Sequence, residues 1–248
     1  MKTVLITGCS SGFGLETARH FLDRGWSVIA TMRTPRDDIL PASGHLRVVP
    51  LDVTNQSSIE RVVDAAGQID VLVNNAGIGW LNALEGTPMD VIRETFETNT
   101  FGTMAMTQAV LPQLRERGSG TIVNVTSSVT LKPLHLLSAY TASKAAVNAF
   151  TEVLALELEP FKVHVRIVLP GRAPDTSFGQ NARARLQSGI PDAYAELAQR
   201  VFTSWQQDAG SVTHARDVAE AVWRAATDPT CPMRLPAGAD AVALMTNQ

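Results

Sequence analysis

The feature that most constrains this chain is an alternation of short apolar runs with helical patterns, which continues almost from end to end. The apolar runs are continuous, as is typical of parallel strands covered on both faces. This order predicts right-handed crossovers and a doubly wound α/β sheet of about seven parallel strands, with helices on both faces. The predicted strands are Val4–Thr7, Trp26–Thr31, Leu46–Val49, Ile69–Val73, Thr121–Val125 and Val163–Leu169. The predicted helices are Leu15–Arg24, Ser57–Ala66, Met89–Asn99, Gly102–Arg117, a helix from about Tyr140 to Pro160, and Ala215–Thr227.

No linker, repeat or low-complexity tract interrupts this pattern, so we expect residues 1–248 to form a single domain. Residues 172–213 differ from the rest because they are polar, with scattered apolar side chains and no clear periodicity. A long irregular insertion in a compact domain usually has a function, often as a lid. We therefore predict that this segment covers a substrate.

Composition and charge narrow the classes of function. The net charge of −3 and the absence of a basic block argue against a nucleic-acid partner. Two cysteines, Cys9 and Cys231, provide no disulfide framework and fit a reducing compartment. The sequence shows no leader peptide and no apolar run of about 20 residues, so we expect a cytoplasmic protein without a membrane partner. The five histidines lack metal-ligand spacing, so we expect no metal site.

A glycine-rich loop, Thr7–Gly14, follows the first predicted strand and leads into a helix. Glycines allow a backbone to approach a pyrophosphate, whose charge the helix N-terminus stabilises, as in Rossmann-type folds. The glycine spacing differs from the familiar G-x-G-x-x-G, and a purely structural turn is the alternative. We expect a dinucleotide to bind the following residues of this loop: Gly8, Ser10, Ser11, Gly12, Phe13 and Gly14.

The end of the second strand indicates which dinucleotide binds. Folds that bind NAD place an acidic residue there, on the ribose 2′-hydroxyl. This chain has Arg33 instead, and a guanidinium suits a 2′-phosphate. The interpretation is NADP(H), and the alternative is that Arg33 is an ordinary surface residue.

Tyr140 and Lys144 are four residues apart at the start of a long helix, so their side chains lie on one face. A phenol has an ordinary pKa of about 10, and a nearby ammonium lowers it. We therefore expect Lys144 to lower the pKa of Tyr140 and to make it a general acid/base. A packed ring beside a solvated amine is the alternative.

These motifs, in this order, resemble the short-chain dehydrogenase/reductase family over nearly the whole chain. The resemblance implies that Asp52 and Val53 contact the adenine. It also places Asn75, Ala76, Gly77, Pro170 and Gly171 along the cofactor, with Thr176 on the nicotinamide carboxamide. The segment before Thr176 is one residue longer than the commonest family pattern. The C-terminus lacks the glycine-rich ending of many tetrameric members, so we expect a homodimer, with a tetramer as the alternative.

The resemblance further implies a catalytic set of Asn99, Ser127, Tyr140 and Lys144. Tyr140 exchanges the proton, Ser127 binds the same substrate oxygen, Lys144 holds the nicotinamide ribose, and Asn99 holds a water that links Lys144 to solvent. Ser127 lies between two other hydroxyl residues and could be only a strand-end hydroxyl, while Asn99 could only satisfy buried backbone.

The implied function is NADP(H)-dependent reduction of a ketone or aldehyde, or oxidation of a secondary alcohol. A non-catalytic NADP-binding regulator is the alternative, although a regulator need not keep these four residues. We expect an apolar pocket for the small-molecule substrate, with these lining residues: Leu134, His135, Phe178, Phe202 and Trp205.

Overall fold

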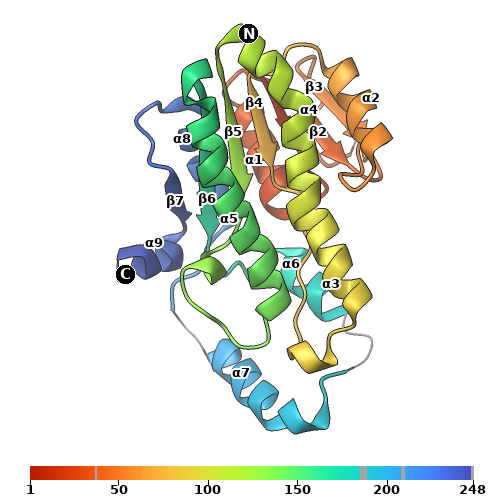
Figure 1. Cartoon of the computed structure of the whole chain (residues 1–248), viewed down its shortest axis with the longest axis vertical. Coiled ribbons are helices and arrows are strands. Elements are labelled where there is room, and N and C mark those ends of the chain that lie inside the picture. Colours follow the sequence, from red (N-terminus) through yellow and green to blue (C-terminus); the bar gives the residue numbers. More distant parts are fainter. Residues whose placement is uncertain (37, 185–188, 208–209, 247–248) are drawn as a thin grey trace.

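The computed structural model describes residues 1–36, 38–184, 189–207 and 210–246. Seven parallel strands form one sheet in the order β3-β2-β1-β4-β5-β6-β7, which confirms the doubly wound α/β prediction (Figure 1). The strands are β1 (Thr3–Ile6), β2 (Ser27–Met32), β3 (Leu46–Pro50), β4 (Val71–Asn74), β5 (Gly120–Val125), β6 (Val163–Pro170) and β7 (Arg234–Ala237). The first six lie within two residues of their predicted bounds. The seventh is a short edge strand whose proline an edge position tolerates.

Helices cover both faces of the sheet, because successive strand side chains point to opposite sides. Val4 and Ile6 pack beneath α1 (Gly12–Leu22) and α8 (Ala215–Thr227), whereas Leu5 packs on the opposite side. That opposite side carries α2 (Gln56–Ala66), α4 (Gly102–Arg117) and α5 (Ser138–Leu158). The remaining α-helices outside residues 172–213 are α3 (Met89–Phe96) and α9 (Ala239–Thr246). Single turns complete the chain: η1 (Leu84–Gly86), η2 (Glu97–Phe101), η3 (Ser128–Thr130), η4 (Glu159–Phe161) and η5 (Asp192–Tyr194).

We call residues 172–213 the arm; its described residues include two α-helices where the sequence predicts an irregular segment. The two helices are α6 (Ser177–Ala184) and α7 (Ala195–Gln207), and α7 lies beyond the sheet at the end away from the N-terminus (Figure 1). The apolar residues Ala198, Val201, Phe202 and Trp205 recur at helical spacing and pack in a small core with parts of the main body. The prediction of an irregular segment was wrong, because the polar outer face of α7 obscured this short apolar repeat.

Candidate active site

The glycine-rich loop between β1 and α1 is tied to the segment that follows β4. The hydroxyl oxygen of Thr7 accepts hydrogen bonds from the backbone N–H groups of Asn75 and Ala76, each at 3.0 Å. In return, Nδ2 of Asn75 donates to the carbonyl oxygens of Thr7 at 2.9 Å and Gly8 at 3.1 Å. Two sequence-distant loops therefore form one unit at the carboxyl edge of the sheet. Thr7 was not among the predicted site residues, although its hydroxyl directly precedes the first glycine.

The loop requires glycine at its three glycine positions. Gly8 and Gly12 adopt φ of +75° and +55°, in the left-handed region that favours glycine. A Cβ on Gly8 would lie 2.8 Å from the Cα of Ala76, and a Cβ on Gly14 would overlap the carbonyl oxygen of Gly8. The first turn of α1 contains no acidic residue, and the side chain of Ser11 does not cap the helix. A helix N-terminus without a competing carboxylate fits a pyrophosphate.

Arg33 lies close enough to Asp52 for its positive charge to act on the Asp52 carboxyl. Hydrogen bonds from Thr54 hold the pKa of the Asp52 carboxyl below its ordinary value, and the positive charge of Arg33 lowers that pKa further. Val53 packs so closely on Gly102 that a Cβ there would lie 2.8 Å from a Val53 methyl group. A second arginine, which the sequence analysis did not select, reaches this region: Nη2 of Arg36 donates to the carbonyl oxygen of Ser10 at 2.8 Å.

Tyr140 and Ser127 meet at the carboxyl end of β5. Tyr140 is 6% exposed, and Ser127 forms a hydrogen bond with its phenol. Burial raises the pKa of Tyr140 to about 12, an effect that the bond from Ser127 partly offsets. The Ser127 hydroxyl oxygen also accepts the Val129 N–H at 3.3 Å, so a local backbone bond fixes the same oxygen that contacts the phenol.

Lys144 is buried on the same face of α5. Burial lowers the pKa of Lys144 to about 8, and its ammonium donates to the carbonyl oxygen of Val125 at 3.0 Å. The expected lowering of the Tyr140 pKa by Lys144 does not occur in this structure. Burial, which raises the pKa of Tyr140, is the dominant effect, and the Lys144 amine is directed to a backbone carbonyl. At pH 7 Tyr140 therefore holds its proton.

Asn99 lies in η2, a π-helical turn between α3 and α4 where the sequence predicts the end of one helix and a short gap. Its Oδ1 accepts the N–H of Ile78 at 2.8 Å, while Nδ2 donates to the Ile78 carbonyl at 2.9 Å and to the Ser143 hydroxyl at 3.0 Å. A Cβ on Gly77 would lie 3.2 Å from Oδ1 of Asn99 and 3.3 Å from Nζ of Lys144. Asn99 therefore fixes the Gly77 segment against α5. Turns of this kind are frequent at functional sites.

The start of the arm lies over the glycine-rich loop. The methyl group of Thr176 lies 3.6 Å from the position that a Cβ on Gly12 would take. The segment before Thr176 is one residue longer than the commonest family pattern, and Thr176 nevertheless reaches the glycine-rich loop. The N–H of Gly171, after Pro170, donates to the Thr213 hydroxyl at 3.0 Å. Two residues beyond Thr176, the ring of Phe178 lies 5.7 Å from the ring of Tyr140.

The other predicted pocket residues have different surroundings. Leu134 and His135 are exposed on the segment before α5. The rings of Phe202 and Trp205 pair at 5.9 Å within the small core under α7. Among the described residues, Phe178 is the predicted pocket residue that the structure brings into ring contact with Tyr140.

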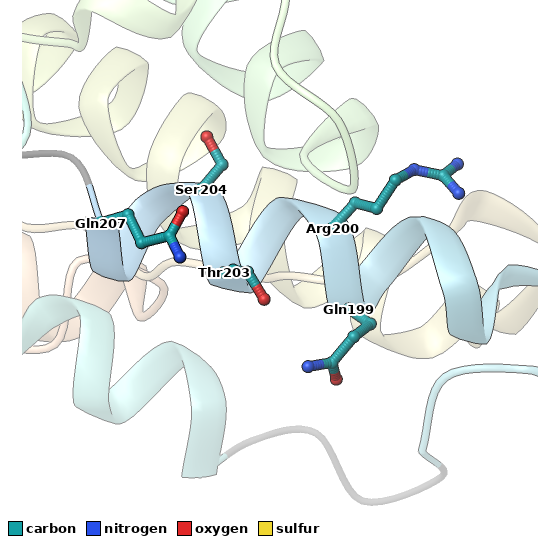
Figure 2. A pocket seen from close by; sticks show the side chains of 5 residues that line it. All are labelled: Gln199, Arg200, Thr203, Ser204 and Gln207. Atoms are coloured by element: carbon teal, nitrogen blue, oxygen red, sulfur yellow. The ribbon is translucent and has the colours of Figure 1, made fainter.

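A hollow of about 570 Å³ lies on the polar face of α7 (Figure 2). Five α7 residues line it: Gln199, Arg200, Thr203, Ser204 and Gln207. It contains none of the residues near Tyr140, and all its lining side chains are polar, so we place the candidate chemistry at the carboxyl edge of the sheet. Within the described ranges there is no cluster of side chains suited to a metal ion. In the same ranges, no helix is both long enough and apolar enough to cross a membrane.

Comparison with known proteins gives consistent matches. A family model described as "short chain dehydrogenase" matches residues 2–187. A 3-ketodihydrosphingosine reductase of Bacteroides thetaiotaomicron is 34% identical over 96% of this chain and 88% of that protein. Human retinol dehydrogenase 8 is 38% identical over 68% of this chain and 58% of its own length.

Solved structures agree with these matches. A short-chain dehydrogenase from Streptomyces avermitilis superposes with a TM-score of 0.84 at 36% identity, covering 99% of this chain and 91% of that chain. A Burkholderia cenocepacia short-chain dehydrogenase in complex with NADP gives a TM-score of 0.78 at 27% identity, covering 100% of this chain and 94% of that chain. A 3-ketoacyl-(acyl-carrier-protein) reductase from Brucella melitensis complexed with NADH gives a TM-score of 0.77 at 26% identity. This match covers 95% of this chain and 96% of the reductase chain.

Proposed function

Because this chain belongs to the short-chain dehydrogenase family, we propose that it is an NADP(H)-dependent oxidoreductase acting on a carbonyl compound or the corresponding secondary alcohol. One observation carries the proposal: the phenol of Tyr140 is buried and hydrogen-bonded to Ser127, with Lys144 on the same helix face. This group lies at the edge of the sheet where the glycine-rich loop fits a pyrophosphate.

The chain's own residues control the proton and the orientation of the substrate. The nicotinamide, when bound, supplies or accepts the hydride. Tyr140 donates its phenolic proton to the substrate oxygen during reduction. In the reverse direction the phenolate form of Tyr140 takes the proton of the alcohol, so oxidation requires that the phenol has first lost its proton. Ser127 donates a hydrogen bond to the same oxygen, where negative charge develops, and so stabilises the transition state more than the ground state. The raised pKa of Tyr140 keeps the proton in place until the substrate oxygen becomes basic.

Lys144 and Asn99 support this proton transfer. We assign to Lys144 the binding of the nicotinamide ribose, since its buried ammonium lies beside the Gly77 segment. Asn99 positions that segment through both of its bonds to Ile78, and the water that it holds in the family's relay is part of the same proposal.

We propose an apolar carbonyl compound as the substrate. The phenyl ring of Phe178 next to Tyr140 supports this choice, because it provides an apolar wall beside the reacting group. The names of two relatives, a 3-ketodihydrosphingosine reductase and a retinol dehydrogenase, support it as well.

The direct experiment measures the rate of NADPH oxidation in the presence of each compound in a panel of aliphatic, aromatic and steroidal ketones and aldehydes. NADH and the Tyr140→Phe variant are run in parallel. We expect turnover that prefers NADPH and falls by at least about a hundredfold in the variant, in the range of lost general acid catalysis. Tight NADPH binding without turnover of any panel member would instead support the non-catalytic regulator.

We also propose that the protein is cytoplasmic and acts as a homodimer. Cys9 and Cys231 are both free and buried, which fits a reducing compartment. Val153 and Leu156 of α5 are 56% and 71% exposed, which gives this helix an apolar outer surface that a second copy can cover. A monomer mass in light scattering would contradict the dimer.

A further inference from the structure

Asn148 lies on the same face of α5 as Tyr140 and Lys144, because the three residues follow one another at intervals of four. Its side chain is 5% exposed. The amide Nδ2 donates to the hydroxyl of Thr130 at 2.9 Å, across 18 positions of sequence. Within the part of the chain that the structure describes, the buried Oδ1 of Asn148 has no hydrogen-bond partner. A buried amide with an unpaired acceptor lowers stability, so packing alone does not explain an asparagine at this position.

The hydroxyl of Thr130 connects Asn148 to Ser127. It accepts the bond from Asn148 and donates to the carbonyl oxygen of Ser127 at 2.8 Å. The N–H of Thr130 donates to the same carbonyl oxygen at 3.3 Å. The side-chain oxygen of Ser127 accepts the N–H of Val129, also in η3. The η3 turn therefore fixes both the main chain and the side chain of Ser127, and Asn148 fixes η3 to α5.

The contact between the Ser127 hydroxyl and the phenol of Tyr140 depends on how two elements meet. Ser127 follows β5, whereas Tyr140 lies on α5. Lys144 makes one link between these elements, through the carbonyl oxygen of Val125 at the end of β5. Asn148, one helical turn farther along α5, makes a second link to the turn that holds Ser127. Catalytic groups lose much of their effect when they are displaced by about 1 Å, so both links bear on the chemistry.

We infer that Asn148 is a positioning residue, which acts through the Thr130 hydroxyl to hold the Ser127 hydroxyl against the phenol of Tyr140. This inference rests on the proposed function, because it concerns the same catalytic group. A positioning role predicts that Asn148 has an effect only while residue 127 carries a hydroxyl. A purely structural role predicts the same effect with or without that hydroxyl.

The first measurement uses neither cofactor nor substrate. The chain contains two tyrosines, Tyr140 and Tyr194, so tyrosine enriched in carbon-13 at Cζ gives two NMR resonances, which Tyr140→Phe assigns. The Cζ resonance of Tyr140 reports the hydrogen bond between its phenol and Ser127. Tyr194 bonds to Glu85 instead, and its resonance is the internal reference.

We expect Asn148→Ala to move the Tyr140 resonance in the same direction as Ser127→Ala does, and to add no further shift in the double variant. Thr130 is only half-buried, so Thr130→Val folds more readily and should repeat the shift. Thr130→Ser keeps the hydroxyl and should leave the resonance at its wild-type position.

The matched control is Thr151→Val, which also removes a buried hydrogen bond from α5. The hydroxyl of Thr151 donates to the carbonyl oxygen of Val147 at 2.6 Å and accepts a bond from Asn124 at 2.8 Å. This variant should lower the melting temperature without moving the Tyr140 resonance. A loss of stability alone is thereby separated from a loss of positioning.

The second measurement is the rate of NADPH oxidation with a ketone that the wild type reduces. We expect Asn148→Ala to lower kcat/KM about tenfold, less than the loss of a direct transition-state donor, while the Kd for NADPH stays within about twofold. In the Ser127→Ala background, followed in single turnovers, the same substitution should change the rate by less than about twofold.

Two results would overturn the inference and leave the proposed function standing. One is a Tyr140 resonance that stays in place in both Asn148→Ala and Thr130→Val. The other is an equal fall in rate with and without the Ser127 hydroxyl. If the wild type reduces no carbonyl compound, the proposed function fails instead, and the Tyr140 resonance still decides whether Asn148 positions Ser127.

Discussion

At the scale of a single residue, the burial of the Lys144 ammonium lowers the stability of the folded chain. Its side chain is 5% exposed, and burial lowers its pKa from 10.5 to about 8. The unfolded chain therefore binds more protons than the folded chain between about pH 8 and pH 10.5. The contribution of Lys144 to the free energy of unfolding is consequently lowest below pH 8 and rises with pH through that window. Retaining a buried ammonium despite this cost is typical of functional positions.

Lys144→Met should increase the free energy of unfolding at pH 7 by about 1–2 kcal/mol while abolishing activity. Removing the buried charge stabilises the fold by about 3 kcal/mol, and leaving the Val125 carbonyl unpaired costs roughly 1–2 kcal/mol. The advantage over wild type should vanish near pH 10, where the wild-type lysine is neutral in the folded state. Urea denaturation at pH 7 and pH 10 measures both values.

The matched control for this variant is Lys132→Met. Lys132 is exposed, so its replacement should leave the free energy of unfolding within about 0.5 kcal/mol of wild type at both pH values. If the difference in free energy of unfolding between Lys144→Met and wild type does not change between pH 7 and pH 10, Lys144 is not deprotonated in that range. The burial argument would then be wrong.

At the scale of elements, the position of α6 depends on Gly79. A Cβ at this position would lie 2.8 Å from the ring of Phe178 and 3.1 Å from the Cβ of Ala182, both on α6. Ala182 has no flexible side chain to move away, so the helix itself must shift. Phe178 is the α6 residue that contacts the ring of Tyr140. Gly79 therefore sets how closely α6 approaches Tyr140.

We expect Gly79→Ala to raise KM for the carbonyl substrate about tenfold and to leave the Kd for NADPH within about twofold. A displacement of about 1 Å at a substrate-positioning group is sufficient for such an effect. Steady-state kinetics and fluorescence titration of NADPH measure the two quantities. Gly44→Ala is the control, because a Cβ on Gly44 meets nothing within 4 Å. An unchanged KM would mean that α6 does not line the substrate site.

The sequence predicted the elements whose signal is local. Continuous apolar runs located the first six strands, and the loop of glycines located the start of α1. The helices of the arm were missed because the apolar stripe of α7 covers only two turns beside a polar face. The π-helical turn at Asn99 was missed because it depends on a shift in backbone hydrogen bonding, which composition does not reveal.

Side-chain environment was harder to predict than side-chain proximity. The spacing of Tyr140 and Lys144 placed both on one face of α5, as observed. The direction of the Tyr140 pKa was predicted wrongly, because residue spacing carries no information on burial. The bond from Arg36 to Ser10 joins residues 26 apart, and no pattern in the sequence indicates it.

At the scale of the whole molecule, different regions have different roles. The carboxyl edge of the sheet provides the glycine-rich loop and the group around Tyr140, while the arm places Thr176 and Phe178 over them. Both ends of the arm are held at its base, where the N–H of Thr213 donates to the carbonyl oxygen of Arg172 at 2.8 Å. The side chain of Asp240 accepts bonds from the Arg172 N–H and the Thr213 hydroxyl, both at 2.6 Å. The arm therefore extends from a fixed base next to the site.

The central claim is hydride transfer governed by Tyr140, and isotope transfer tests it most directly. The enzyme is incubated with a ketone that it reduces and with NADPH that carries deuterium at both C4 positions of the nicotinamide. Mass spectrometry then locates the label in the alcohol. We expect one deuterium on the former carbonyl carbon, and we expect Tyr140→Phe to lose label transfer although it still binds NADPH. Product without deuterium on that carbon, or undiminished transfer by the variant, would contradict the account.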